Sequence, residues 1–141
     1  MLTSSDIKLA LREAGLDVFR SRGDAVFIAE RVRENLILDS GVQVEGEPLT
    51  VRFVVSAQAS EFPGQADATL FATARKLAKP ALAQGFSEAE TRITPLPDPS
   101  DPDRVLDHSF EVAFARTVND LSEAVEAARF ALSLARSAHR E

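Results

Sequence analysis

Two histidines are the only imidazole groups in this 141-residue chain, and they stand far apart in the sequence. His108 precedes an alternating apolar run, where a histidine serves either as a general base or as part of the core or its rim. His139 comes near the end of a predicted helix, where a cation complements the helix dipole. Single histidines at such distant positions do not make a multi-histidine metal site by local spacing.

Four carboxylates gather between residues 95 and 107: Asp98, Asp101, Asp103 and Asp107. Such carboxylates are oxygen ligands for a hard cation. The segment lacks the glycine that lets a calcium loop turn sharply, and its prolines restrict how carboxylates converge. Cation binding and a rigid, solvated proline loop are both compatible with this pattern.

Absent motifs exclude several chemistries. There is no GxGxxG, GxxxxGK[ST] or GxSxG pattern. The chain has no cysteine, which excludes disulfides, thiol catalysis and thiolate metal sites. We therefore assign no catalytic, cofactor-binding or metal-binding residue and expect no cofactor. An alternative is an enzyme or small-ligand protein that uses His108, Arg92, Arg116 and Glu111 near one end of a sheet.

Charge and composition limit the classes of partner and the cellular compartment that we expect for this protein. The net charge is −6 and both halves are acidic, which disfavours nucleic-acid binding. No apolar run approaches the ~20 residues that span a bilayer, so we expect no membrane association. The first six residues lack the features of a signal peptide, which predicts a cytoplasmic protein. Thirteen of the sixteen basic residues are arginine, and alanine is abundant, which suggests a bacterial source.

The length predicts a single domain over residues 1–141. A helix capped by Ser4 or Ser5 should run to about Ala14. Residues 24–38 are ambiguous between helix and strand: apolar residues at helical spacing favour a helix over 25–35, but short strands also fit.

The remaining elements alternate between strands and helices. Period-two alternation predicts an antiparallel hairpin over 42–57, and a helix should follow over 66–79 until Pro80 ends or kinks it. Strands are expected over 89–94 and 109–117, separated by a loop over 95–104, and a long helix over 120–137. The order α-(β)-α-β-β-α-β-β-α predicts an α+β fold with an antiparallel sheet of about four to five strands packed with helices.

The predicted final helix carries more apolar surface than is required to pack against one neighbouring element. A helix that covers a sheet requires an apolar stripe somewhat over roughly 100° wide, and the apolar residues here extend well past half the circumference. The excess predicts a second contact, either within the chain or with a second subunit. The candidate interaction surface consists of Leu121, Val125, Ala128, Phe130, Leu132, Leu134 and Ala135.

In size, acidity and element order the chain resembles the type III secretion chaperone fold and the YbjN-like bacterial family. The likeness lies in the hairpin 42–57, the helix 66–79, the strands 89–94 and 109–117, and the helix 120–137. It implies dimerisation and the binding of extended protein segments without catalysis. Over 24–38 the family pattern has a strand where the periodicity favours helix.

We therefore expect a non-catalytic, chaperone-like or adaptor module that binds another protein or itself as a homodimer. Two alternatives remain open: the small-ligand protein or enzyme described above, and a structural subunit of a larger assembly.

Overall fold

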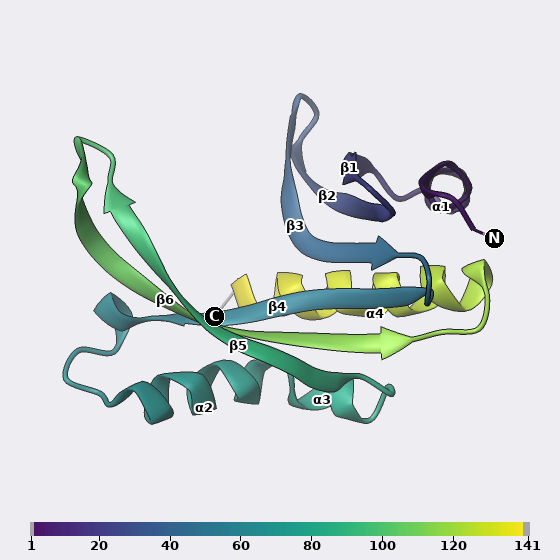
Figure 1. Ribbon diagram of the computed structural model, residues 1–141. Coiled ribbons are helices and arrows are strands. Elements are labelled where there is room, and N and C mark those ends of the chain that lie inside the picture. The colour runs from purple at the N-terminus through teal and green to yellow at the C-terminus, as the bar shows by residue number, and fades with distance from the viewer. Residues whose placement is uncertain (1, 140–141) are drawn as a thin grey trace.

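The computed structural model describes residues 2–139, with side chains described over 2–134. It contains one six-stranded antiparallel sheet with the strand order β1-β2-β3-β4-β6-β5, together with helices (Figure 1). The predicted α+β class is confirmed, and the sheet has more strands than the four to five expected.

The helices and strands have the following bounds. The helices are α1 (Ser4–Glu13), α2 (Asp67–Leu77), α3 (Lys79–Leu82) and α4 (Leu121–His139), with a short 3-10 turn η1 (Ala59–Glu61). The strands are β1 (Val18–Arg22), β2 (Ala25–Arg33), β3 (Leu36–Glu45), β4 (Thr50–Gln58), β5 (Ser87–Asp98) and β6 (Asp101–Thr117).

The core lies on one face of the β4–β6 pair. Alternate residues of β4 are buried, and Phe53 stands opposite Phe114 in the register. The Phe53 ring stacks on Phe114 at 5.5 Å between centroids and forms a T-shaped pair with Phe86 at 5.1 Å. Both α2 and α4 pack against β4. The alternation that predicts these two strands therefore also identifies the face that the helices cover.

The predicted caps of the first helix, Ser4 and Ser5, are wrong, because the N-cap lies one residue before Ser4. Thr3 is the N-cap: its Oγ1 accepts a hydrogen bond from the Asp6 backbone N–H at 3.2 Å, and the Asp6 carboxylate accepts from the Thr3 N–H at 2.9 Å. This reciprocal capping box satisfies two backbone donors that a helix end leaves free. Ser4 and Ser5 lie inside the first turn.

The helix favoured over residues 25–35 is wrong, because this segment forms β2 and the turn into β3. Ile28 and Ala29 are neighbours in sequence and are both buried, because the pairing of β2 shifts register on both sides at this point. Val32 and Leu36 also stand at the helical spacing that favours a helix. They belong to different strands, however, and both are exposed.

A kink in β3 separates its first half from β4. Ser40 and Gly41 are inserted between two stretches of β2–β3 pairing, and Gly41 has a positive φ of 83° that favours glycine. The Ser40 hydroxyl donates to the Ile28 carbonyl at 2.6 Å and accepts from the Val42 N–H at 3.1 Å. The part of β3 before the kink lies away from β4, which pairs only with residues 43–45 (Figure 1).

The loop expected over 95–104 is also wrong, because β5 continues to Asp98 and β6 begins at Asp101. The Asp98 carboxylate accepts hydrogen bonds from the Ser100 N–H at 2.9 Å and hydroxyl at 2.7 Å, which closes a tight turn. Strand β5 is an edge strand, where a proline without an N–H is tolerated. Proline there is compatible with strand structure.

The positions of the helices after β4 agree more closely with those predicted from the sequence. Pro80 divides the predicted helical segment into α2 and α3, as expected. Asp120 caps α4 by accepting a hydrogen bond from the Glu123 N–H at 2.8 Å. The last helix extends to His139, slightly beyond its predicted end.

Candidate protein-interaction surfaces

The α4 residues predicted as an interaction surface occupy different environments. Ala128 and Leu132 are buried in the core. The half-buried members pack against the margin of the same core: Leu121, Val125, Phe130 and Leu134. The side chain of Ala135 lies outside the described residues. Intramolecular packing therefore covers the centre of the stripe and leaves its flanks partly accessible.

The two flanks of α4 face different neighbours. Phe130 stacks on Phe86 with centroids 6.2 Å apart. Leu121 and Val125 lie on the other flank, beside α1. The structure thus does not bring the predicted residues together on one free surface.

A groove with a volume of about 360 Å³ runs between α1 and α4. Its apolar lining consists of Ala10, Ala14, Leu121 and Val125. Its polar lining consists of Glu13, Ser122, Glu126 and Arg129. Arg129 Nη2 donates to the Ala14 carbonyl at 2.5 Å, so the guanidinium links the last helix to the end of the first.

The opposite face of the sheet carries a polar pair from the enzyme hypothesis. Arg92 Nε lies 3.1 Å from Glu111 Oε1, and the Thr94 hydroxyl donates to the same carboxylate oxygen. The depression around this pair holds about 20 Å³. That volume accommodates about one water molecule, whereas small-molecule sites measure roughly 300–1,000 Å³.

The other two residues of the enzyme hypothesis do not join this pair. His108 is exposed and stands opposite Pro95 on a hairpin. Arg116 lies at the far end of β6, roughly 26 Å along the strand from His108 at 3.3 Å per residue. Its guanidinium instead contacts Glu123 of α4 at 2.8 Å. The four side chains therefore do not converge.

The carboxylates between residues 95 and 107 are not brought together as a set of cation ligands in the described residues. The Asp107 carboxylate accepts hydrogen bonds from the Ser60 N–H at 3.0 Å and hydroxyl at 2.5 Å, and the hydroxyl contact lowers the pKa of Asp107. Asp98 closes the turn, where the Ser100 hydroxyl lowers its pKa. Within residues 2–134, no group of three or more His, Asp or Glu side chains is placed to hold a metal ion.

Two hairpins project beyond the part of the sheet that the helices cover (Figure 1). We call residues 29–40 the β2–β3 arm and residues 94–108 the β5–β6 arm. The β2–β3 arm extends past the pairing with β1, which ends at Ile28, and past the pairing with β4. The β5–β6 arm extends past Ser109, where the pairing of β6 with β4 ends. Each arm is thus a two-stranded hairpin along most of its length.

Both arms expose large apolar side chains. On the β2–β3 arm these are Val32, Leu36, Ile37 and Leu38, and on the β5–β6 arm they are Val105 and Leu106. Their exposed fractions range from 37% at Ile37 to 60% at Leu106. This exposure was not predicted from the sequence. The available signal was the uninterrupted run of Leu36, Ile37 and Leu38, since consecutive exposed apolar residues are unusual unless they are functional.

An ion pair fixes the base of the β2–β3 arm. Arg31 Nη2 and Nε lie 3.0 and 3.2 Å from the two carboxylate oxygens of Asp17, which precedes β1. The same guanidinium donates to the Glu34 carbonyl in the turn at 2.8 Å. Hydrogen bonding to Arg31 lowers the pKa of Asp17. One side chain therefore links the arm's turn to the segment before β1.

Comparison with protein-family models, curated proteins and solved structures finds no match. No helix of the described part of the chain has the length and apolar character needed to cross a membrane.

Proposed function

We propose that this chain is a non-catalytic protein-binding module, a chaperone-like protein or adaptor that acts as a homodimer in a bacterial cytoplasm. The observation that carries the proposal is the exposure of large apolar side chains on the two arms. A two-stranded hairpin is only marginally stable in water by itself. Covering these side chains with another protein removes apolar surface from water and stabilises the arms.

The polar pair on the open face gives less support to the alternative of an enzyme or small-ligand protein. Arg92 and Glu111 form an ion pair with each other, and the space beside them suits about one water molecule. A structural subunit of a larger assembly would use the same exposed arms. Co-purification from the native host distinguishes that alternative from a homodimer.

The likeness to the type III secretion chaperone fold and the YbjN-like family is part of this proposal. It implies a strand over 24–38, and the presence of β2 and the start of β3 there supports it. The compartment and source in the proposal rest on composition: the chain has no cysteine and is rich in arginine and alanine.

Backbone hydrogen exchange tests the proposal through the arms. In dilute protein we expect rapid exchange over residues 30–40, because free-standing hairpins open readily. At concentrations that favour association we expect slower exchange there, while β4 and the paired part of β6 stay protected at both concentrations. Arms that exchange at one unchanged rate over a thousandfold range of concentration would contradict the proposed homodimer.

A further inference from the structure

The outer edge of β3 is open over the β2–β3 arm. Strand β4 pairs with residues 43–45 alone, because the kink at Ser40 and Gly41 turns the earlier part of β3 away. In the part of the chain that the structure describes, no strand pairs with that edge over residues 36–42. An open edge presents backbone N–H and C=O groups that pair readily with another strand.

This edge is apolar on both faces of the arm. Leu36 and Leu38 lie on one face and Ile37 on the other, because successive side chains alternate across a strand. All three are exposed. A strand added at this edge brings its own side chains beside these on each face, and such cross-strand neighbours interact favourably.

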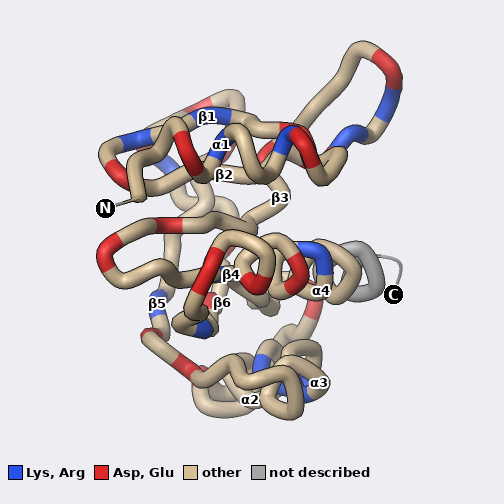
Figure 2. Tube along the Cα trace, turned by 90° about the vertical axis from the view of Figure 1, so that its right-hand side faces the viewer, with Lys and Arg blue, Asp and Glu red and all other residues tan. Residues whose placement is uncertain are grey.

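The other sheet edges carry features that discourage pairing. Strand β5 is an edge strand with Pro95 and Pro97, which have no N–H to donate. Strand β1 is short and carries the exposed charges of Arg20 and Arg22 (Figure 2). Short strands, charges and prolines are the usual protections of an edge. The apolar stretch of β3 before Asp39 carries neither a charge nor a proline.

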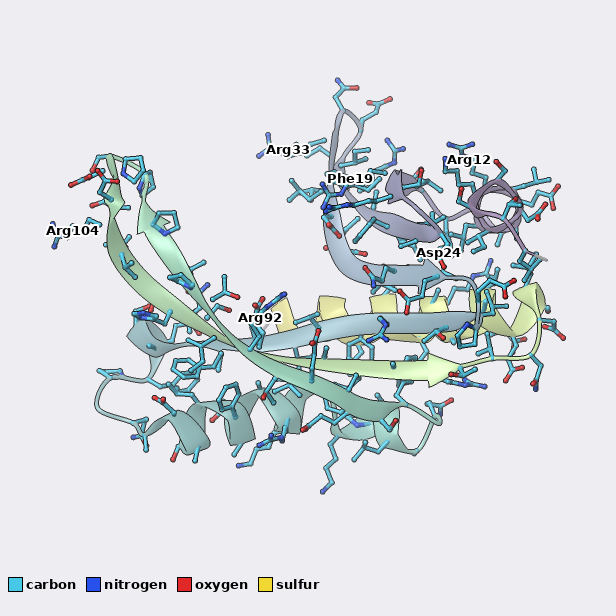
Figure 3. All side chains as sticks on the ribbon, viewed as in Figure 1. Arg12, Phe19, Asp24, Arg33, Arg92 and Arg104 are labelled. Atoms are coloured by element: carbon cyan, nitrogen blue, oxygen red, sulfur yellow. The ribbon has the colours of Figure 1, made fainter. Side chains whose placement is uncertain are left out.

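Charge also distinguishes the two arms as surfaces for self-association. The β5–β6 arm carries four aspartates against Arg104, a formal charge of −3, so two such arms repel each other. On the β2–β3 arm Arg31 is neutralised by Asp17. Arg33 projects from this arm in Figure 3, and the adjacent Glu34 balances its charge. Counted over residues 29–40, the β2–β3 arm carries three carboxylates against two guanidinium groups, a formal charge of −1, so two such arms repel each other less than two β5–β6 arms do.

We propose that β3 of the β2–β3 arm pairs antiparallel with β3 of a second copy about a two-fold axis, which deepens the proposed homodimer and rests on it. The two arms then form a four-stranded sheet in the order β2-β3-β3-β2. A two-fold axis brings the same patch of each copy together and closes the assembly. The pairing covers the open edge and gives both sets of backbone groups partners.

The proposed register places the axis at Ile37, and the charges exclude an axis at Asp39. With the axis at Ile37, that residue stands opposite its own copy and Leu36 stands opposite Leu38. Asp39 then faces Asn35, and the two Asp39 carboxylates stay apart. A register with the axis at Asp39 would place like charges opposite each other, which is destabilising.

A cysteine cross-link tests the pairing, since the natural chain has no cysteine. Residues directly opposite in an antiparallel pair have Cα atoms about 4.5–5.5 Å apart, within the roughly 4.4–6.8 Å that a disulfide spans. Under mild oxidation Ile37→Cys is expected to become a covalent dimer at least tenfold faster than Val105→Cys, a control at an exposed residue of the other arm. Equal rates in an associating protein would overturn the pairing and leave the proposed function standing.

A charge variant keeps the test independent of disulfide chemistry. Ile37→Lys places two ammonium groups opposite each other and is expected to yield monomers, as is Ile37→Glu. An equimolar mixture of the two is expected to regain association, because opposite charges then face each other across the axis. Circular dichroism checks that each variant is folded. A mixture that stays monomeric would overturn the register, and a wild-type monomer at every concentration would overturn both proposals.

Discussion

Replacing two leucines of the β2–β3 arm by serine should weaken the homodimer strongly. The variant is Leu36→Ser with Leu38→Ser, at side chains that are 41% and 49% exposed. Full burial of a leucine stabilises by about 1.5–3 kcal/mol, so covering the exposed fractions of both stabilises by about 1.4–2.7 kcal/mol per copy. A two-fold dimer counts this contribution twice, for about 3–5 kcal/mol in all.

That free energy corresponds to about two to four orders of magnitude in the dimer dissociation constant. Sedimentation velocity over a dilution series measures the constant. Interference optics suit the protein, because it has neither tryptophan nor tyrosine to absorb near 280 nm. The side chains are already accessible, so the melting temperature of the isolated chain should change little.

A matched control changes two leucines that lie off the arms. Leu9 of α1 and Leu82 of α3 are 59% and 57% exposed. Leu9→Ser with Leu82→Ser makes the same chemical change at comparable exposure and should leave the dissociation constant within about threefold. Equal association of the arm variant and the control variant would refute a dimer contact through Leu36 and Leu38.

Three further predictions test the fold. Thr3→Ala should lower the free energy of unfolding by about 1 kcal/mol by removing the cap of α1, and an equal loss in Ser5→Ala would contradict that assignment. Phe53→Ala should cost about 3–5 kcal/mol in denaturant unfolding, since the ring is buried between two others; a loss below about 1 kcal/mol would contradict the packing. Arg31→Gln should raise the pKa of Asp17 toward its usual 3.8 in an NMR titration. The wild-type carboxylate has a depressed folded pKa, so its stabilising contribution is present above the unfolded value and is lost as pH falls through the folded one; an unchanged pKa would contradict the ion pair.

The centre of the sheet could be predicted from the sequence because each strand there has one buried face. Phe53 and Val55 in β4, and Phe110 and Val112 in β6, alternate with residues of the other face. Alternation of apolar and polar residues with a period of two indicates directly that one face of a strand is buried. The helix break at Pro80 could be predicted because proline removes a backbone donor.

The two arms could not be predicted because their patterns have other causes. In β2 and β3, the register shifts and the apolar residues outside the core together imitate helical spacing. In β5, prolines that usually indicate a loop occur on an edge strand, where the pairing with β6 continues to Asp98 through register shifts on both sides of Pro97. Local patterns do not encode which strand lies at an edge, because that depends on the topology of the whole sheet.

The predicted α4 surface shows a similar limit. A broad apolar arc predicts more than one contact, and α4 does contact the sheet and α1 within the chain. The arc does not reveal that both contacts are intramolecular. The exposed apolar run Leu36–Leu38 of the β2–β3 arm instead lies at the end of the segment 24–38, which is ambiguous between helix and strand from the sequence.

Sedimentation equilibrium of the unmodified protein tests the proposed homodimer most directly. The average mass should rise with concentration from the chain mass of 15.3 kDa toward twice that value and then level off, as a closed two-fold assembly requires. A mass that stays at 15.3 kDa up to the highest attainable concentration would contradict the homodimer, and growth beyond twice the chain mass would contradict its closure.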